Sequence, residues 1–260
     1  KEENQDFHGI VVPDNEQLET KGIAAAIADG VSGSAAGREA SESSVSGFLN
    51  DYYSTPDSWT VKTSITKVLN SINRWLYRQS EKTNYTQYDH VTTFTGTIFK
   101  STTAHIFHSG DSYRYRGDDL EQLTRDHRII VSETENYLSR ALGIELHIEI
   151  DYRQVSIQRG DLFLYTTDGI HDFLDDKSIK AILQDTSTSL DEKCKTLISQ
   201  SLDNNSSDNL TSQIIEITSL PNPNDEEFYS RLTKLPFPPD LAIGNIIDGY
   251  KILRDIHQSK

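Results

Sequence analysis

The sequence predicts an α+β fold in which antiparallel β-sheets carry helices on their outer faces. Two helical segments accompany the opening strands, several strands then come in succession, and two further helices precede a last strand. This order lacks the regular alternation of strand and helix that is typical of a parallel sheet. Apolar residues make up 35% of the 260 residues, a modest share that still lets a chain of this length bury a substantial core.

The first third of the chain is predicted to hold two strands and two helices. Residues 7–12 and the small apolar run that begins at Ile23 are predicted strands, separated by a turn at residues 13–15. Residues 35–53 are predicted to form a helix. Residues 60–80 give the clearest helical signal, because apolar side chains recur there every three to four residues. We expect one buried stripe made of Val61, Ile65, Val68, Leu69, Ile72, Trp75 and Leu76.

The pattern then changes to strands. Runs rich in β-branched and aromatic residues predict strands at residues 91–99, 103–108, 112–116, 148–157, 161–167 and 210–217. The polar segment 125–140 is predicted to be a loop, with a short helix around residues 137–142. Two further helices are expected at residues 177–184 and 190–203.

The composition shifts after Ile217. Five of the seven prolines lie beyond this point, together with an acidic cluster at residues 225–227. This composition is typical of a linker. The chain ends with a strand-like piece at residues 248–253, for which the remaining sequence offers no partner. We therefore expect a domain at residues 1–217, a Pro-rich acidic linker at 218–245 and a separate piece at 246–260.

Charge and cysteine content exclude several classes of partner. Forty acidic against 25 basic residues give a formal charge of −15, which repels nucleic acid and anionic membrane surfaces. The single cysteine, Cys194, excludes an internal disulfide and indicates a reducing, cytoplasmic compartment. No apolar run is long enough to span a bilayer, and no signal peptide is visible. Lys1 is not an initiator, so the chain is expected to be a fragment whose targeting signals lie outside it; we expect it to be a monomer without membrane contact.

Four aspartates share one context, the end of an apolar strand candidate: Asp29, Asp111, Asp168 and Asp208. Taken singly, each Asp-Gly or Gly-Asp pair indicates an ordinary turn. Taken together, four carboxylates at neighbouring strand ends need a counter-charge. Mg²⁺ and Mn²⁺ take such oxygen ligands, and a shared carboxylate can bridge two ions about 3.5–4 Å apart.

At these residues the sequence resembles the metal-dependent Ser/Thr protein phosphatases of type 2C (the PPM family), in their bacterial form. The resemblance covers roughly residues 1 to 217, and its motifs occur in the family's order. The matching segments are KEENQD at 1–6, ADGVSGSAAGREAS at 28–41, HSGDSYRYR at 108–116, LTRDH at 123–127, LYTTDG at 164–169 and SSDNLT at 206–211. The resemblance implies a four-layer αββα sandwich, with two antiparallel sheets flanked by helix pairs and a binuclear metal centre at one end.

The resemblance also assigns roles to single residues. It implies that Asp29 bridges two Mn²⁺ or Mg²⁺ ions and that Gly30 offers its carbonyl to the second ion. Asp168 and Asp208 correspond to ligands of the first ion, and these three aspartates form the catalytic set. By the same resemblance, Asp6 holds metal-bound water, and Asp111 is a ligand of a third, weaker site with help from Asp168. Asn209 supports Asp208 through hydrogen bonds. Lys1 is the phosphate-binding group.

The implied reaction is direct hydrolysis of phosphoserine and phosphothreonine in proteins by a metal-bridging hydroxide. Three positions depart from the family pattern. Lys1 replaces an Arg and lacks its planar fork for phosphate. Gln5 stands where many relatives have a Glu ligand, which predicts weaker binding of the second ion. Val31 replaces the His that animal members use to protonate the leaving group, so another donor has to serve.

Some features allow two interpretations. Residues 126–137 are either a flap over the site, with Ser132 touching the third metal, or a plain surface loop. His105 and His108 are predicted to face opposite sides of a strand, and His171 to be an ordinary loop residue.

Residues 246–260 resemble the first strand of a Ser/Thr protein kinase domain, which implies a kinase in the same parent chain; the alternative is a docking tail. For the whole chain, the alternative to a phosphatase acting on phosphorylated proteins is a pseudo-phosphatase that serves as a regulatory or binding module for a kinase.

Overall fold

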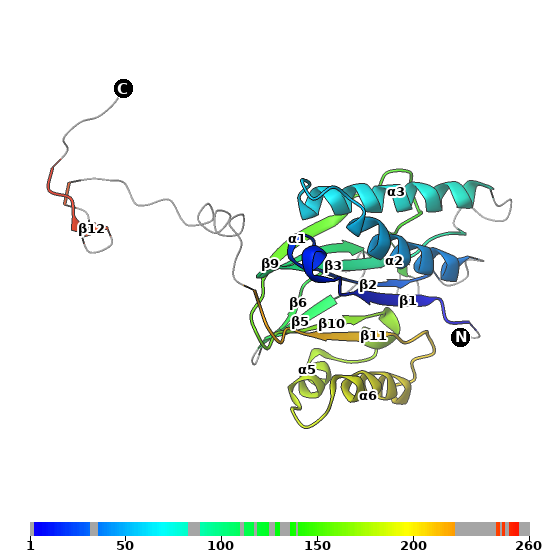
Figure 1. Cartoon of the computed structure of the whole chain (residues 1–260). Coiled ribbons are helices and arrows are strands. Elements are labelled where there is room, and N and C mark those ends of the chain that lie inside the picture. The colour runs from blue at the N-terminus through cyan, green and yellow to red at the C-terminus, as the bar shows by residue number, and fades with distance from the viewer. Residues whose placement is uncertain are drawn as a thin grey trace. The chain divides into compact units, whose positions relative to one another are not determined.

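The computed structural model shows two antiparallel sheets packed between two pairs of helices (Figure 1). The structure describes residues 3–31, 36–82, 89–109, 112–116, 119–124, 128–130, 136–138, 140–221, 243–244, 246–247 and 250–254. The chain divides into two compact units, Lys1–Asn222 and Pro223–Lys260. In the first unit, α2 (Gly37–Tyr53) and α3 (Val61–Lys82) cover one sheet, and α5 (Asp176–Gln184) and α6 (Leu190–Asp203) cover the other. The predicted αββα architecture is confirmed.

The first sheet has the strand order β1-β2-β3-β4-β9, and every neighbouring pair is antiparallel. Its strands are β1 (Asp6–Val11), β2 (Ile23–Asp29), β3 (Phe94–Lys100), β4 (Thr103–Ser109) and β9 (Asp151–Ser156). Strand β2 alternates between two cores, because successive side chains of a strand point to opposite faces. Ala24, Ala26 and Ala28 lie beneath α2, whereas Ala25 and Ile27 face the second sheet.

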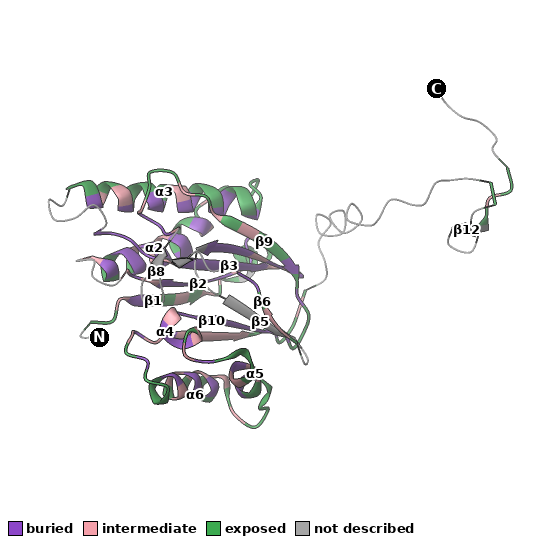
Figure 2. Cartoon of the chain, turned by 180° about the vertical axis from the view of Figure 1, so that it is seen from behind, coloured by how far each residue is buried: buried purple, intermediate pink, exposed green. Residues whose placement is uncertain are grey.

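The second sheet has the order β11-β10-β5-β6 and is also antiparallel. Its strands are β5 (Ser112–Arg116), β6 (Asp119–Gln122), β10 (Leu162–Thr166) and β11 (Ser212–Glu216). Strand β10 is buried along its whole length because both of its faces are covered. The edge strands of the two sheets are joined where Gln213 Nε2 donates to Gly9 O over 3.4 Å. Figure 2 shows the buried residues concentrated between the layers.

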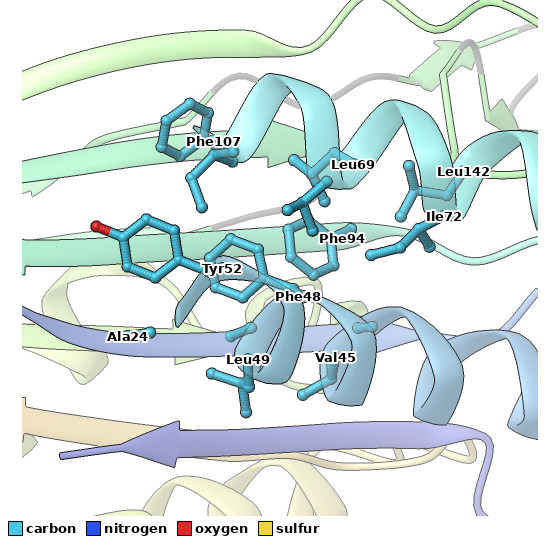
Figure 3. Packing of buried hydrophobic residues seen from close by; sticks show 14 of the residues in the cluster. Ala24, Val45, Phe48, Leu49, Tyr52, Leu69, Ile72, Phe94, Phe107 and Leu142 are labelled. Atoms are coloured by element: carbon cyan, nitrogen blue, oxygen red, sulfur yellow. The ribbon is translucent and has the colours of Figure 1, made fainter. Parts of the chain in front are cut away.

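The core beneath α2 and α3 combines large side chains of the helices with the small alanines of β2 and the large rings of Phe94 and Phe107 on β3 and β4 (Figure 3). Phe48 and Phe94 meet edge to face, with 5.1 Å between ring centroids. Gly96 of β3 leaves the room for these rings, because a Cβ there would come 2.8 Å from Phe48 and 2.9 Å from Phe94. A Cβ on Gly9 would come 2.8 Å from Leu49 Cδ1, so α2 lies directly on β1 as well.

The predicted stripe of α3 is buried except at one position. Trp75 is 41% exposed, and the expectation that it belongs to the core is wrong. Positions 61, 65, 68, 72 and 76 follow the three-to-four spacing that faces the sheet, and residue 75 is turned about 100° from residue 76 around the helix axis. Its indole instead lies edge-on to the ring of His90.

Other differences concern short elements. The helix expected around residues 137–142 is wrong: β8 (Asn136–Leu138) pairs with β7 (Arg128–Ile130), and Leu142 forms a bridge with Thr92. The bridge uses the backbone N–H and C=O of Leu142, at 2.9 and 3.1 Å, and so withdraws the groups that a helix would need. The sequence also gave no indication of α1 (Asn15–Thr20), β6 or α4 (Asp168–His171).

In the second unit, β12 (Ile246–Ile247) pairs with β13 (Tyr250–Lys251). The strand-like piece expected to lack a partner therefore pairs with the residues just before it. Among the described residues of the whole chain, no helix is long and apolar enough to cross a membrane.

Candidate metal-binding active site

Two acidic side chains lie opposite each other on neighbouring strands of the first sheet. Asp6 begins β1 and Asp29 ends β2, and the antiparallel register pairs the two residues directly. Residues paired in this way have Cβ atoms about 5 Å apart on one face of the sheet, where like charges repel. The backbone of Asp29 is held by the segment just before β3, because its N–H donates to Thr93 Oγ1 over 3.0 Å and its C=O accepts from Thr92 Oγ1 over 2.8 Å.

A third carboxylate comes from the second sheet. Asp168 comes two residues after the end of β10 and is the first residue of α4. It lies close enough to Asp6 for its negative charge to act on the Asp6 carboxyl. The structure thus places Asp6 opposite Asp29 and brings Asp168, which is far away in the sequence, near to Asp6 from the second sheet.

Burial dominates the electrostatics of Asp6, whose exposed fraction is 7%. Removal from water raises the pKa of its carboxyl, the polar groups of Thr211, Thr167 and Asp29 oppose this, and the charge of Asp168 raises the pKa further. The net direction is upward. Without a counter-charge, Asp6 therefore holds its proton more firmly than an exposed aspartate does.

A buried hydroxyl connects Asp6 to the second sheet. Thr167 Oγ1 donates to Asp6 Oδ2 over 2.9 Å and accepts from the Thr211 N–H over 3.1 Å. The backbone N–H of Thr167 in turn donates to Thr211 O over 3.1 Å. Sequence reasoning missed Thr167, although it directly precedes Asp168 in the TTDG motif.

Gly30 lies where the start of α2 approaches the end of β2. A Cβ at this position would come 2.2 Å from Gly37 O, so only glycine fits. The Gly30 N–H donates to Gln5 O over 3.1 Å, and the same carbonyl accepts from Ser41 Oγ over 2.6 Å. The segment before β1 is therefore fixed to both β2 and α2. Ser41 is a second residue whose contact the sequence did not indicate.

The loop before β11 is tied to the N-terminal segment through Asn209. Its side chain accepts from the Gln5 N–H over 2.9 Å and donates to Glu3 O over 3.0 Å. Its backbone N–H donates to Asp208 Oδ1 over 2.6 Å. The amide side chain of Asn209 thus reaches the segment that leads to Asp6, while its backbone fixes the Asp208 carboxylate.

Three predicted site residues, Lys1, Asp111 and Ser132, lie outside the described residues. The two strand histidines have separate partners: His105 Nδ1 lies 2.9 Å from the Tyr152 hydroxyl, and His108 Nδ1 lies 3.2 Å from Thr95 Oγ1. They do not converge on one ion. His171 ends α4, with Nδ1 3.2 Å from Thr166 Oγ1.

The residues present fit a hard divalent cation. The donors are carboxylate and carbonyl oxygens, as Mg²⁺ and Mn²⁺ prefer, and Asp6 Oδ1 is buried without a hydrogen-bond partner among the described residues. Within the same residues, no three His, Cys, Asp or Glu side chains already form a cluster that could hold a metal ion.

Comparison with known proteins yields one consistent group. A family model described as "Protein phosphatase 2C" matches residues 1–205. The "Serine/threonine phosphatase stp" of Listeria innocua is 28% identical over 212 residues, which cover 73% of this chain and 82% of that protein. A protein of the same name from Listeria monocytogenes gives the same values.

Solved structures share the fold. Serine/threonine phosphatase Stp1 from Staphylococcus aureus superimposes with a TM-score of 0.73 at 20% identity, covering 84% of this chain and 90% of that one. Serine/threonine phosphatase PstP/Ppp from Mycobacterium tuberculosis gives a TM-score of 0.68 at 21% identity, covering 84% and 94%.

Proposed function

This chain belongs to the protein phosphatase 2C family, and on that premise we propose how it acts: it is a serine/threonine protein phosphatase that hydrolyses phosphoserine and phosphothreonine at a binuclear Mn²⁺ or Mg²⁺ centre. The observation that carries the proposal is the convergence of Asp6, Asp29 and Asp168 from both sheets. Asp6 is buried in this group, and a buried carboxylate beside other carboxylates is costly unless a cation offsets the charge.

We assign the ligands as follows. Asp29 would be shared by the two core ions, Gly30 would offer its carbonyl to one of them, and Asp168 and Asp208 would hold the other. Asp6 would orient water at the centre, and Asp111 would contribute to a third site. When bound, the ions lower the pKa of coordinated water and offset charge on the phosphoryl oxygens.

The chain's own residues do the positioning. The Asp29 backbone is held by hydrogen bonds from Thr92 and to Thr93, and this limits the positions that its carboxylate can take. The Asn209 side chain and Ser41 hold the backbone of residues 3–5. This segment follows Lys1, which we propose as the phosphate-binding group.

A second part of the proposal concerns domain organisation. We assign residues 1–217 to the phosphatase domain, 218–245 to a linker and 246–260 to the start of a kinase-like domain. The division of the chain into compact units at Asn222 supports the first boundary.

The test is hydrolysis of p-nitrophenyl phosphate with Mn²⁺, with EDTA, and by the Asp29→Asn variant. We expect EDTA and Asp29→Asn each to reduce turnover by roughly 100-fold or more, since each removes charge stabilisation of the transition state. Asp51→Asn is the matched control, because Asp51 is exposed on α2. Equal, negligible turnover in every case would show that the chain is a binding module and would refute the phosphatase proposal.

A further inference from the structure

One buried hydroxyl joins the two sheets at the proposed metal site. Thr167 Oγ1 lies 2.9 Å from Asp6 Oδ2, and the two residues are separated by 161 positions in the sequence. Thr167 is 4% exposed and Asp6 7%. Asp6 belongs to the edge strand of the five-stranded sheet, whereas Thr167 directly follows β10 of the four-stranded sheet.

The direction of this hydrogen bond is fixed by its surroundings. A threonine hydroxyl has one proton to donate and two lone pairs that accept. The Thr211 N–H already donates to Thr167 Oγ1 over 3.1 Å. The hydroxyl proton is therefore available to Asp6 Oδ2, and the restricted χ1 of a β-branched side chain keeps it there. The Thr167 backbone is held in place, because its N–H donates to Thr211 O.

This contact distinguishes the two oxygens of Asp6. Thr167 engages Oδ2, whereas Oδ1 is buried without a hydrogen-bond partner among the described residues. The negative charge of Asp168 would otherwise favour a rotation of the Asp6 carboxylate away from it, because like charges repel.

We propose that Thr167 is a positioning residue: its hydroxyl holds the Asp6 carboxylate so that Oδ1 is presented to the metal centre. The inference rests on the proposed function and adds a residue to it. A hydrogen bond that orients a group at a metal centre commonly contributes 10- to 100-fold, in rough terms, to metal affinity or activity.

The test replaces Thr167 by Val, which keeps the branched shape and removes the hydroxyl. Calorimetric titration with Mn²⁺ should show affinity about 10-fold lower than in the wild type. In turnover of p-nitrophenyl phosphate, the Mn²⁺ concentration for half-activation should rise, while kcat at saturating Mn²⁺ falls by less than about 3-fold. Thr167→Ser restores the hydroxyl and should bring the affinity back to within about 3-fold of the wild type.

Tyr52→Phe controls for the loss of a buried hydrogen bond as such. The Tyr52 hydroxyl donates to Lys21 O over 2.7 Å, both residues are buried, and Lys21 precedes β2 at the end opposite Asp29. Tyr52→Phe should lower the melting temperature of the metal-free protein and leave Mn²⁺ affinity unchanged.

The outcomes distinguish a failure of this inference from a failure of the proposed function. A wild-type chain that binds Mn²⁺ and hydrolyses the substrate, with a Thr167→Val variant of equal Mn²⁺ affinity, overturns this inference alone. So does a Thr167→Ser variant no better than Val, or a Tyr52→Phe variant that loses affinity equally. A wild-type chain that binds no Mn²⁺ overturns the proposed function and this inference with it.

Discussion

At the scale of single residues, Asp6 carries a carboxyl whose pKa is raised, chiefly by burial. Its raised pKa means that the folded chain binds a proton more tightly than the unfolded chain does. The stability that this proton contributes is complete below the ordinary aspartate pKa and is lost as the pH rises through the raised value. Metal-free protein should therefore lose stability over that range.

Asp6→Asn removes the titrating carboxyl of Asp6. The difference in stability between the wild type and this variant therefore measures the contribution of Asp6 apart from those of the other carboxylates. In EDTA, the free energy of unfolding of the wild type relative to Asp6→Asn should fall as the pH is raised from about 4 to 7. Urea unfolding at several pH values measures the difference. With Mn²⁺ the trend should reverse, because the cation favours the charged carboxylate. Parallel pH profiles of the two proteins in EDTA would contradict the assignment.

The sequence predicted these carboxylates as site residues but did not predict which groups they contact. Asp29 and Asp168 were recognised because each ends an apolar strand, and Asp6 through its family motif. The contact of Thr167 with Asp6 could not be predicted, because it joins residues 161 positions apart and depends on how the two sheets pack. Threonine after a strand has no local signature that distinguishes such a role from an ordinary turn.

At the scale of elements, length and periodicity decided what was predictable. The predicted bounds of α6 agree with the structure, and a capping box between Ser189 and Glu192 marks its start. Helix α1 and strand β6 are too short to show a period. The helix predicted around residues 137–142 failed because backbone pairing between Leu142 and Thr92 outweighed local propensity.

The junction between β2 and α2 gives a prediction at this scale. Gly30→Ala places a methyl group against the backbone at Gly37, which cannot rotate away as a side chain can. The end of β2 and the start of α2 must then separate, and we expect a loss of about 2–4 kcal/mol of stability together with most Mn²⁺ binding. Chemical unfolding and calorimetry measure the two effects.

Gly47→Ala is the matched control within α2. Its new methyl group would meet only the flexible end of Ile72, at 3.2 Å, and alanine favours a helix over glycine by up to about 1 kcal/mol. We expect a stability change of less than about 1 kcal/mol and unaltered Mn²⁺ affinity. If Gly30→Ala were equally mild, the close approach of α2 would not be what positions Asp29.

At the scale of the whole molecule, the candidate site depends on the contact between the two sheets. The edge strands β1 and β11 are joined by the hydrogen bond from Gln213 to Gly9, and the contact between Asp6 and Thr167 likewise joins the first sheet to the second. The strand order β1-β2-β3-β4-β9 places residues far apart in the sequence next to each other, as in the pairing of Ile23 with Phe99. Periodicity predicts strands but not this order. The order of elements along the chain predicted antiparallel sheets with helices outside, whereas the four-layer arrangement of two sheets and two helix pairs came from the family resemblance.

The boundary of the phosphatase domain gives the last prediction. A chain ending at Asn222 should keep the melting temperature of residues 1–260 within about 2 °C and kcat/KM within about 2-fold, because the compact unit ends there. A chain ending at Glu216 should melt roughly 5–10 °C lower. It loses the buried Ile217 side chain and the packing of Leu220 against the core between the sheets. It also loses two backbone hydrogen bonds, from Ile217 N to Asp161 O at 2.9 Å and from Gly160 N to Ile217 O at 2.8 Å.

Circular dichroism in EDTA measures both transitions without a contribution from bound metal. If the chain ending at Asn222 melted as low as the shorter one, residues beyond 222 would have to belong to the phosphatase domain.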